Sequence, residues 1–538
     1  MRNNMALGWF YSPSQIRRYI LSRPTSLKPP RAQLRNPIAI LRELDAHQWQ
    51  MFSVGFIGWT WDAFDFFTVA LTVTEIAKDF GVENSQVTWG ITVTLMLRSV
   101  GALIFGSLSD RYGRKWPFIF NLGLFIILEL ASGFCQNLSQ FLAVRSLYGI
   151  AMGGLFGPAA ATALEDLPYD ARGLLSGLYQ QGYAMGYLLA AIFYRALVPT
   201  TTHGWRSIFW FGACPPVLII AYRLWLPETN HFQVMAAERE EKERLRSAHG
   251  GTMQHAGAKA WLHQMKLDLK RNWVLFIYMV FLMTGFNSVS HGSQDLYPTF
   301  LKNQVEMNPS QTTIISVVGQ IGALIGGTTI GYISAFSGRR LVMLICCVLG
   351  GCILPAYIIP RSMSLVASAF FMQFFVGGVW GPIPIHLSEL SPPALKTTVV
   401  GFTYQLGNLA SSASATIQGI IGERFPISPR CVGAVCTPRF DYGRVIGIFI
   451  GAVYAWMIVF LLIGPEMEEK ERKEYAVTTD DLEDLRKKGN SLQEIGKERA
   501  RRAFDAERRA SAAGQGSSSD LEKPPVGEHI EATTGIHV

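Results

Sequence analysis

Long apolar runs recur along most of the chain and set the first expectation for its fold. A helix needs roughly 20 apolar residues to cross the hydrocarbon core of a bilayer, and most of these runs are too long and too continuous for core helices of a soluble protein. They predict spans at 50–78, 88–109, 116–135, 139–162, 172–197, 206–226, 273–296, 310–335, 341–359, 363–386, 396–421 and 443–464. The pattern therefore predicts an all-α membrane protein.

The second half of the chain repeats the first at an offset of about 225 residues. The matching segments are 106–115 with 331–340, 153–165 with 377–389, and 179–182 with 404–407. Such duplication is typical of secondary transporters, which bind substrate near the midplane between their halves. We therefore expect twelve transmembrane helices in two six-helix pseudo-repeats. The expected N-terminal tail, first bundle, central loop, second bundle and C-terminal tail are residues 1–47, 48–227, 228–271, 272–465 and 466–538.

Charge is scarce and unevenly placed. Charged side chains make up 16% of the sequence and the formal net charge is +8, whereas soluble domains carry about 25% charged residues. Of the 88 charged residues, 44 fall within 228–271 and 465–538. This distribution excludes a soluble enzyme, a nucleic-acid-binding protein and a disordered chain. Because Arg and Lys follow the second and eighth runs but are absent from 135–140 and 200–205, both termini and the central loop are predicted to be cytoplasmic.

The loop after the second run reads GSLSDRYGRK at residues 106–115. It resembles the loop signature of the major facilitator superfamily, and the segment at 331–340 resembles a degenerate second copy, with Ala335 in place of the acid. The glycines allow helix ends to approach closely, and Asp110 can pair with an arginine or a helix end. Such a latch would hold the two halves in one conformation.

The resemblance also implies a second charge network on the cytoplasmic face, in which Glu165 pairs with Arg172 and Glu389 pairs with Lys396. We expect these groups to serve gating or structure rather than substrate binding. The full gating set is Asp110, Arg111, Gly113, Arg114, Glu165, Arg172, Gly338, Arg339, Glu389 and Lys396.

The seventh run contains a polar stripe. Its members are Asn287, Ser290, His291, Gln294 and Asp295. On a helix, Asn287, His291 and Asp295 share one face, and a histidine four residues before a carboxylate can form a hydrogen-bonded pair whose proton affinity depends on its surroundings. Intramembrane ionisable groups are costly and are therefore functional candidates. The alternative is a static polar cluster at the outer helix end, since Pro298 follows.

The run NSVSHGSQDLYPT at 287–299 resembles the signature of the fungal lactate–pyruvate permeases of the Jen type. These carboxylate:proton symporters lie close to the sialate:proton symporter branch of the superfamily. The resemblance implies uptake of short-chain mono- or dicarboxylates, of the lactate, pyruvate, acetate, succinate or malate class, with protons across a fungal plasma membrane.

Arg98, near the middle of the second run, is the expected substrate anchor. A guanidinium stays charged and offers a forked donor that matches a carboxylate. The alternative is a permanent ion pair with Asp62 or Asp65 of the first run. Both hold if a substrate carboxylate competes with an aspartate for Arg98 and releases that acid to take a proton. At the repeat offset the two aspartates fall on Asn287 and Ser290, so both halves are expected to line one cavity.

Side-chain amides in the fifth and eleventh runs are the remaining candidates for substrate contact. Gln180, Gln181, Gln405 and Asn408 can hydrogen-bond the oxygens of a substrate. Equally, membrane helices use amides to bond to one another. No nucleotide-binding loop, zinc-ligand spacing, dinucleotide fingerprint or nucleophile elbow occurs, so we expect no enzyme, cofactor, metal or ATP-driven transport.

Two features lie outside the spans. Cys431 and Cys436 precede the last run on the predicted outer side, where an oxidising environment favours a disulfide over a metal site. Residues 466–510 have the mixed charge of a solvated helix, and 511–538 read as disordered. The family resemblance allows trafficking and ubiquitination machinery to bind this tail, and the alternative is an inert tail.

Two other functions fit the same pattern. One is a proton-coupled carrier of a sugar acid or a neutral sugar, with Arg98 tied permanently to an aspartate in the neutral case. The other is a nutrient sensor that uses a transporter fold without transporting and signals through its tail.

Overall fold

The computed structural model describes residues 13–27, 35–248, 265–270, 272–294, 296–392, 395–432, 435–466 and 491–515. The chain divides into two compact units. A transmembrane body comprises Ser22–Pro227 and Asn272–Glu466, and a smaller unit comprises Met1–Leu21, Glu228–Arg271 and Met467–Val538.

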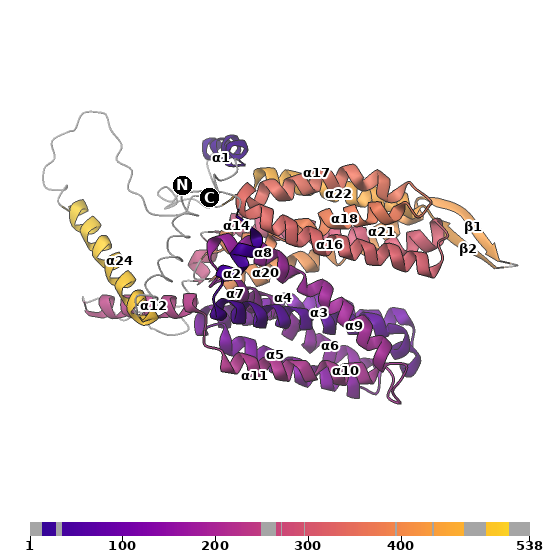
Figure 1. Cartoon of the computed structure of the whole chain (residues 1–538), viewed down its shortest axis with the longest axis horizontal. Helices are drawn as coiled ribbons and strands as arrows, with labels where there is room; N and C mark the ends of the chain where they lie inside the picture. The colour runs from indigo at the N-terminus through magenta and orange to yellow at the C-terminus, as the bar shows by residue number, and fades with distance from the viewer. Residues whose placement is uncertain are drawn as a thin grey trace. The chain divides into compact units, whose positions relative to one another are not determined.

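The first half of the transmembrane body is a helical bundle, coloured indigo to magenta in Figure 1. Its helices are α3 (Ala46–Phe80), α4 (Asn84–Tyr112), α5 (Lys115–Phe134), α6 (Leu138–Gly153), α7 (Phe156–Leu164), α8 (Tyr169–Gln180), α9 (Gly182–Leu197), α10 (Arg206–Gly212) and α11 (Cys214–Trp225). The fourth, fifth and sixth spans are each broken into two helices. The fourth breaks inside a glycine-rich run at 153–157, and glycine lowers helix stability at such a position.

The second half forms the other bundle, coloured salmon to orange in Figure 1. Its helices are α14 (Trp273–Gln294), α15 (Tyr297–Thr299), the π-helix η2 (Phe300–Gln304), α16 (Pro309–Ser337), α17 (Arg339–Ile358), α18 (Leu365–Trp380), α19 (Ile383–Leu390), α20 (Lys396–Ser411), α21 (Ser414–Glu423) and α22 (Tyr442–Ile463). The tenth and eleventh spans are broken, as the fourth and fifth are in the first half.

The predicted twelve-span fold is confirmed. Within the described ranges, nine helical segments are long and apolar enough to cross a membrane. The other three predicted spans fold as α3, α8–α9 and α20–α21 and carry buried polar side chains, among them Asp62, Gln180 and Gln405. These three spans contribute much of the polar interior.

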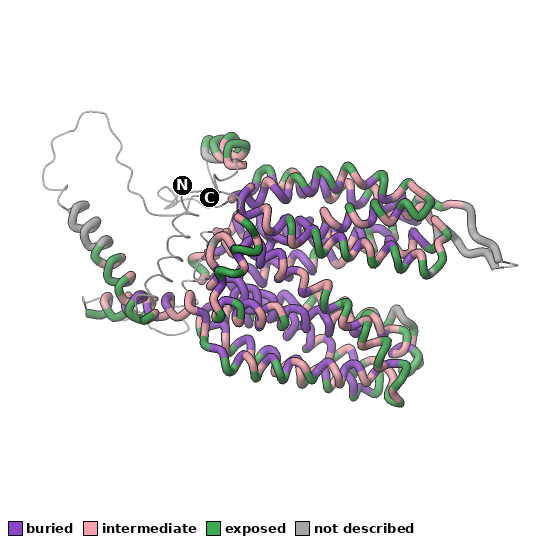
Figure 2. Tube along the Cα trace, in the orientation of Figure 1, coloured by how far each residue is buried: buried purple, intermediate pink, exposed green. Residues whose placement is uncertain are grey.

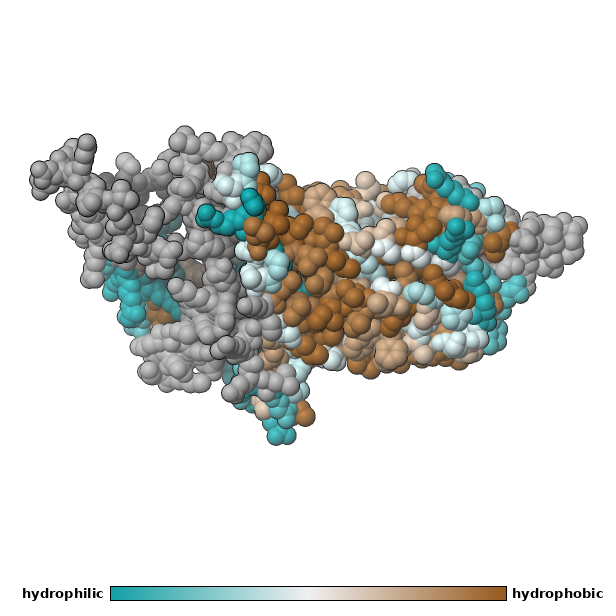
Figure 3. All heavy atoms as spheres, turned by 90° about the horizontal axis from the view of Figure 1, so that it is seen from above, coloured by the Kyte–Doolittle hydropathy of each residue, from teal (hydrophilic) through white to brown (hydrophobic). Residues whose placement is uncertain are grey.

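The outer surface of the body is apolar, as a bilayer requires. Buried positions follow the inner faces of both bundles (Figure 2), whereas Ile127 and Leu218 on the outside are 63% and 72% exposed. Figure 3 shows hydrophobic side chains spread over the middle of the body, with hydrophilic residues toward the hairpin end. In lipid this exposed apolar surface replaces the polar surface of a soluble protein.

We call the end where α3 begins and α22 ends the tail side, and the end from which strands β1 (Pro426–Val432) and β2 (Val435–Phe440) project the hairpin side (Figure 1). On the tail side, the short helix α2 (Pro37–Glu43) packs against α8.

Arg35, just before α2, contacts both bundles. Its guanidinium lies 3.0 Å from Asp170 of α8, and its carbonyl accepts a hydrogen bond from Tyr332 of α16. The N-terminal segment therefore bridges the bundles on the tail side.

The smaller unit pairs a central-loop helix with a C-terminal helix. Helix α12 (Asn230–Ala248) packs on α24 (Leu492–Gln515), and Arg501 donates to the buried carboxylate of Glu241 at 2.8 Å. A methyl group at Gly496 would lie 2.8 Å from the methyl of Ala237, so the close crossing needs glycine there. The charged helix predicted within 466–510 is thus present as α24, and one of its faces packs against α12. It extends to residue 515, five residues into the stretch expected to be disordered, and 516–538 lies outside the described residues.

The β1–β2 hairpin is the one element that the all-α expectation did not include. Its strands are antiparallel, and the backbone register sets Cys431 opposite Cys436. Val432 and Val435 are residues that favour strands.

We predict that Cys431 and Cys436 form a disulfide. Directly opposed residues of an antiparallel pair have Cα atoms about 4.5–5.5 Å apart, which is within disulfide range. Digestion without reductant, followed by mass spectrometry, is expected to recover a peptide that links the two residues. Cys214, which is free and exposed, is expected to be alkylated in the same sample. Recovery of all three residues as alkylated thiols would contradict the prediction.

Candidate functional site

Arg98 of α4 and Asp62 of α3 form a buried ion pair in the first bundle. The Arg98 side chain is 3% exposed, and its Nη2 donates to Asp62 Oδ2 at 3.1 Å. The guanidinium also lies over the ring of Phe66, 5.2 Å from its centroid. Arg98 Nε and Asp62 Oδ1 have no hydrogen-bond partner among the described residues. The pair therefore keeps one donor and one acceptor for another molecule.

Asp65, one turn further along α3, belongs to a different cluster. Its carboxylate accepts a hydrogen bond from Tyr148 of α6. Arg145 of α6 donates to Glu129 of α5 at 3.1 Å and lies 4.1 Å from the centroid of the Tyr148 ring. The sequence reasoning did not select Glu129 or Arg145, although both are charged residues inside apolar runs, the same signal that selected Arg98.

The second bundle approaches the ion pair through α20. Tyr404 of α20 lies near Arg98 and Asp62, and the side chains of Gln180 and Asn408 are close to its hydroxyl group. Amide groups of this kind suit the oxygens of a small polar ligand as well as one another.

Gln180 and Gln405 each have one amide group that makes no hydrogen bond to a described residue. Gln405 is fully buried and accepts from Asn408 at 3.2 Å. Gln405 Nε2 and Gln180 Oε1 have no hydrogen-bond partner in the described part of the chain. Gln181 differs, since its amide bonds to the Gly177 carbonyl and lies against Gly327 of α16. It therefore packs helices together and is not brought to the ion pair.

The polar stripe of α14 is partly engaged inside the second bundle. Asn287 donates to the Met283 carbonyl at 2.9 Å. Ser290 accepts from Trp380 Nε1 at 2.7 Å, and Gln294 donates to Gln373 at 3.1 Å.

His291 and Asp295 are the two ionisable members of the stripe. His291 is half-buried on the same helix. Asp295 lies outside the described residues, so the expected His291–Asp295 pair stays a prediction.

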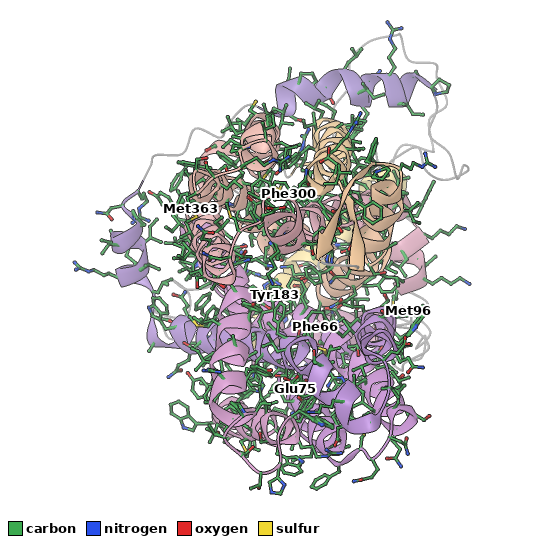
Figure 4. All side chains as sticks on the ribbon, turned by 90° about the vertical axis from the view of Figure 1, so that its right-hand side faces the viewer. Phe66, Glu75, Met96, Tyr183, Phe300 and Met363 are labelled. Carbon is green, nitrogen blue, oxygen red and sulfur yellow. The ribbon has the colours of Figure 1, made fainter. Side chains whose placement is uncertain are left out.

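Aromatic rings from both bundles pack around Tyr404. Phe156 of α7 stacks on Tyr404 with ring centroids 3.9 Å apart. Trp59 and Trp380 lie 6.0 and 5.9 Å from Tyr404. Looking from the hairpin side, Figure 4 shows Phe66 at the boundary between the bundles. We call Trp59, Phe156, Trp380 and Tyr404 the aromatic layer.

Asp110 joins the bundles on the tail side. Its carboxylate accepts from the backbone N–H groups of Thr397 and Thr398 at 3.0 and 2.8 Å, and from the Thr398 hydroxyl at 2.8 Å. It thereby caps the N-terminus of α20 in the other bundle, where a negative charge is favoured. A Cβ at Gly106 would lie 2.7 Å from the Thr398 Cα, so this approach needs glycine.

The other gating candidates lie around this contact. Arg114 makes two hydrogen bonds to Glu165, at 2.8 and 3.1 Å. Arg172 donates to the backbone carbonyls of Leu167 and Glu165. In the second bundle Arg339 bonds to Glu389 at 3.1 Å.

Four further members of the gating set complete this face. Gly113 and Gly338 have φ of +99° and +92° and end α4 and α16. Arg111 lies over the ring of Tyr112, at 5.4 Å, and Lys396 is the buried first residue of α20. The two glycines adopt a backbone conformation that other residues rarely adopt.

A second contact between the bundles joins α8 to α16 and α19. Ser176 donates to the Gly381 carbonyl at 2.8 Å and accepts from the Ile385 N–H at 3.3 Å. A Cβ at Gly177 would lie 2.6 Å from the Gly327 carbonyl oxygen. These contacts hold the two bundles together on the tail side.

Comparison with known proteins adds the family context. Residues 37–477 match the family model described as sugar (and other) transporter. The chain is 40% identical over 461 residues to a carboxylic acid transporter protein homolog of Saccharomyces cerevisiae, covering 85% of this chain and 74% of that protein. It is 23% identical to the sialic acid transporter NanX of Escherichia coli, covering 77% of this chain and 93% of the other.

The fold also matches solved structures. The proton:xylose symporter XylE, a major facilitator superfamily protein, superposes with a TM-score of 0.61 at 18% identity, covering 80% of this chain and 99% of the other. At this identity the likeness concerns the fold alone.

Proposed function

Because this chain belongs to the sugar (and other) transporter family of the major facilitator superfamily, we propose that it is a secondary active transporter that carries short-chain mono- or dicarboxylates together with protons by alternating access. Its family and its relatives are membrane transporters, so the chain is a transporter and not an enzyme. Support for an organic-acid substrate comes from the relatives, which include a carboxylic acid transporter homolog and a cis,cis-muconate transport protein.

The observation that carries this proposal is the buried Arg98–Asp62 pair with its unused donor and acceptor. A substrate carboxylate accepts two hydrogen bonds from the forked guanidinium and takes the place of Asp62. Asp62, left without its counterion in a low-dielectric site, then binds a proton. One negative charge and one proton enter together, so the loaded site has the same net charge as the empty one.

The neighbouring polar groups orient the rest of the substrate in this proposal. Gln180 and Gln405 offer their unused amide groups. Asn287, Ser290 and Gln294 of α14 add polar groups from the second bundle. His291, with Asp295, adjusts the charge near the substrate when a proton or a second carboxylate is present. Gln181 is left out of the binding set, since it packs against α16.

We place the tail side in the cytoplasm of a cell whose plasma membrane the protein spans. The contacts on that side then close the cytoplasmic exit, and the substrate enters from the hairpin side. The gating set opens and closes this exit, and the C-terminal tail is available to trafficking and ubiquitination machinery.

Purified protein in proteoliposomes tests the proposal. An imposed pH gradient, alkaline inside, is expected to drive accumulation of labelled lactate or succinate above the external concentration, and a proton ionophore is expected to abolish it. Absence of gradient-driven carboxylate uptake would overturn the proposal. Uptake of a neutral labelled sugar instead would favour a sugar carrier with Arg98 permanently paired, and binding without flux would favour a sensor.

A further inference from the structure

The first bundle contains a second buried group of acids, separate from the Arg98–Asp62 pair. It comprises Asp65 of α3, Glu129 of α5, and Arg145 and Tyr148 of α6, all of them at most 1% exposed. Glu129 and Arg145 lie in the halves of α5 and α6 nearer the hairpin side, whereas Arg98 lies halfway along α4. The cluster therefore lies on the hairpin side of the Arg98–Asp62 pair.

The cluster holds two carboxylates and one guanidinium. Glu129 Oε2 accepts from Arg145 Nη1 at 3.1 Å, and Asp65 Oδ2 accepts from the Tyr148 hydroxyl. A methyl group at Gly212 of α10 would lie 3.1 Å from Asp65 Oδ1 and 3.4 Å from Glu129 Oε1. Both free oxygens therefore face the same point beside α10.

The formal charges of this cluster do not cancel when both acids are ionised. Asp65 Oδ1 and Glu129 Oε1 have no hydrogen-bond partner among the residues that the structure describes. With both acids ionised, the cluster would carry one uncompensated negative charge in the membrane interior, which is costly. Neighbouring buried carboxylates avoid this cost by sharing a proton.

The other charged groups nearby do not supply the missing charge. Of the helices packed against α5, α6 presents Arg145 and Tyr148, α10 presents Gly212, and α4 carries Arg98, which is engaged by Asp62. The described contacts of Glu129 include no titratable side chain from α7 or α11. The described residues contain no group of three side chains that could hold a metal ion, and the guanidinium beside Glu129 disfavours a cation.

We propose that Glu129 is a proton-binding residue of the transport cycle, which shares one proton with Asp65 and supplies it to Asp62. Asp62 and Asp65 lie three residues apart on one face of α3. When a substrate takes Arg98, an O–H bond of the acid pair breaks and one forms on Asp62. The acid pair is then ionised beside Arg145 and is reloaded with a proton from the solvent. This inference rests on the proposed carboxylate–proton symport.

Glu129→Gln in proteoliposomes tests it by separating exchange from accumulation. Exchange of labelled for unlabelled lactate at equal pH needs no net proton movement and is expected to persist. Accumulation driven by a pH gradient is expected to be lost, with the internal concentration reaching only the external one. Glu129→Asp restores a carboxyl group and is expected to recover accumulation. Glu75→Gln, an acid of α3 bonded to Tyr194 outside the cluster, is the matched control and should accumulate normally.

Each other outcome has a meaning. If wild type neither exchanges nor accumulates carboxylates, the proposed function fails. If wild type accumulates them and Glu129→Gln does so equally, only the role of Glu129 fails. Loss of exchange together with accumulation in a protein of normal thermal stability would make Glu129 structural, and a sodium gradient that drives wild type but not Glu129→Gln would make the cluster a sodium site. If Glu129→Gln does not fold, the double variant E129Q/R145Q removes both charges and carries the same expectation.

Discussion

Arg98→Ala is expected to reduce proton-driven uptake of labelled lactate by at least about a hundredfold, since it removes the charge-assisted hydrogen bonds that hold the carboxylate. Each such bond contributes roughly 1.5–3 kcal/mol, and about 1.4 kcal/mol corresponds to a factor of ten. Arg98→Lys keeps the charge but loses the fork, and we expect it to fall between wild type and Arg98→Ala.

Loss of stability must be separated from loss of binding in this experiment. Arg98→Ala leaves Asp62 buried without its counterion, and breaking one side of a buried pair costs about 3–5 kcal/mol. The double variant R98A/D62N removes both charges and is expected to recover most of the thermal stability without recovering uptake. Arg206→Ala is the matched control, because Arg206 forms a partly exposed ion pair with Asp79, at 2.6 Å, away from Arg98. Normal lactate transport by Arg98→Ala would show that Arg98 does not hold the substrate.

Asp110→Asn is expected to shift the protein toward the conformation that is open on the tail side. The carboxylate caps the first N–H groups of α20 across the bundle boundary, and asparagine keeps one acceptor oxygen without the charge. A loss of about 2 kcal/mol, typical of hydrogen bonds to charged groups, changes the ratio of the two conformations roughly thirtyfold.

Distances between spin labels measure this shift. Labels at Tyr112 of α4 and Ile463 of α22, which are 58% and 46% exposed, report the separation of the bundles on the tail side. A longer distance is expected to dominate in Asp110→Asn. Asp79→Asn, an acid-to-amide change within the first bundle, should leave the distribution of wild type. An unchanged distribution in Asp110→Asn would mean that Asp110 stabilises the fold without latching it.

Local information was sufficient for the fold and for part of the candidate site. Most spans are continuous apolar runs, and the duplication follows from matching segments, so neither needs a contact between distant residues. The gating loop was also found locally, because its glycines and Asp110 are adjacent in the chain. Arg98 was found because a charge inside an apolar run is costly and rare. The same criterion applies to Glu129 and Arg145, which the sequence reasoning passed over.

The sequence does not show which charged residues pair with one another. Asp62 and Asp65 are one turn apart in equally apolar surroundings, and the sequence left both open as partners of Arg98. Only the tertiary structure brings Asp62 to Arg98 of α4 and Asp65 to Tyr148 of α6.

By itself, the sequence determined that this protein crosses the membrane in two related bundles and that a few charges inside them matter, because hydrophobicity and helical periodicity act over short stretches of chain. The tertiary structure alone decided which charge meets which. It set Asp110 on the end of a helix in the other bundle and joined Glu129, Arg145 and Asp65 into one cluster. These contacts join residues far apart in the sequence, and they depend on how several helices pack together.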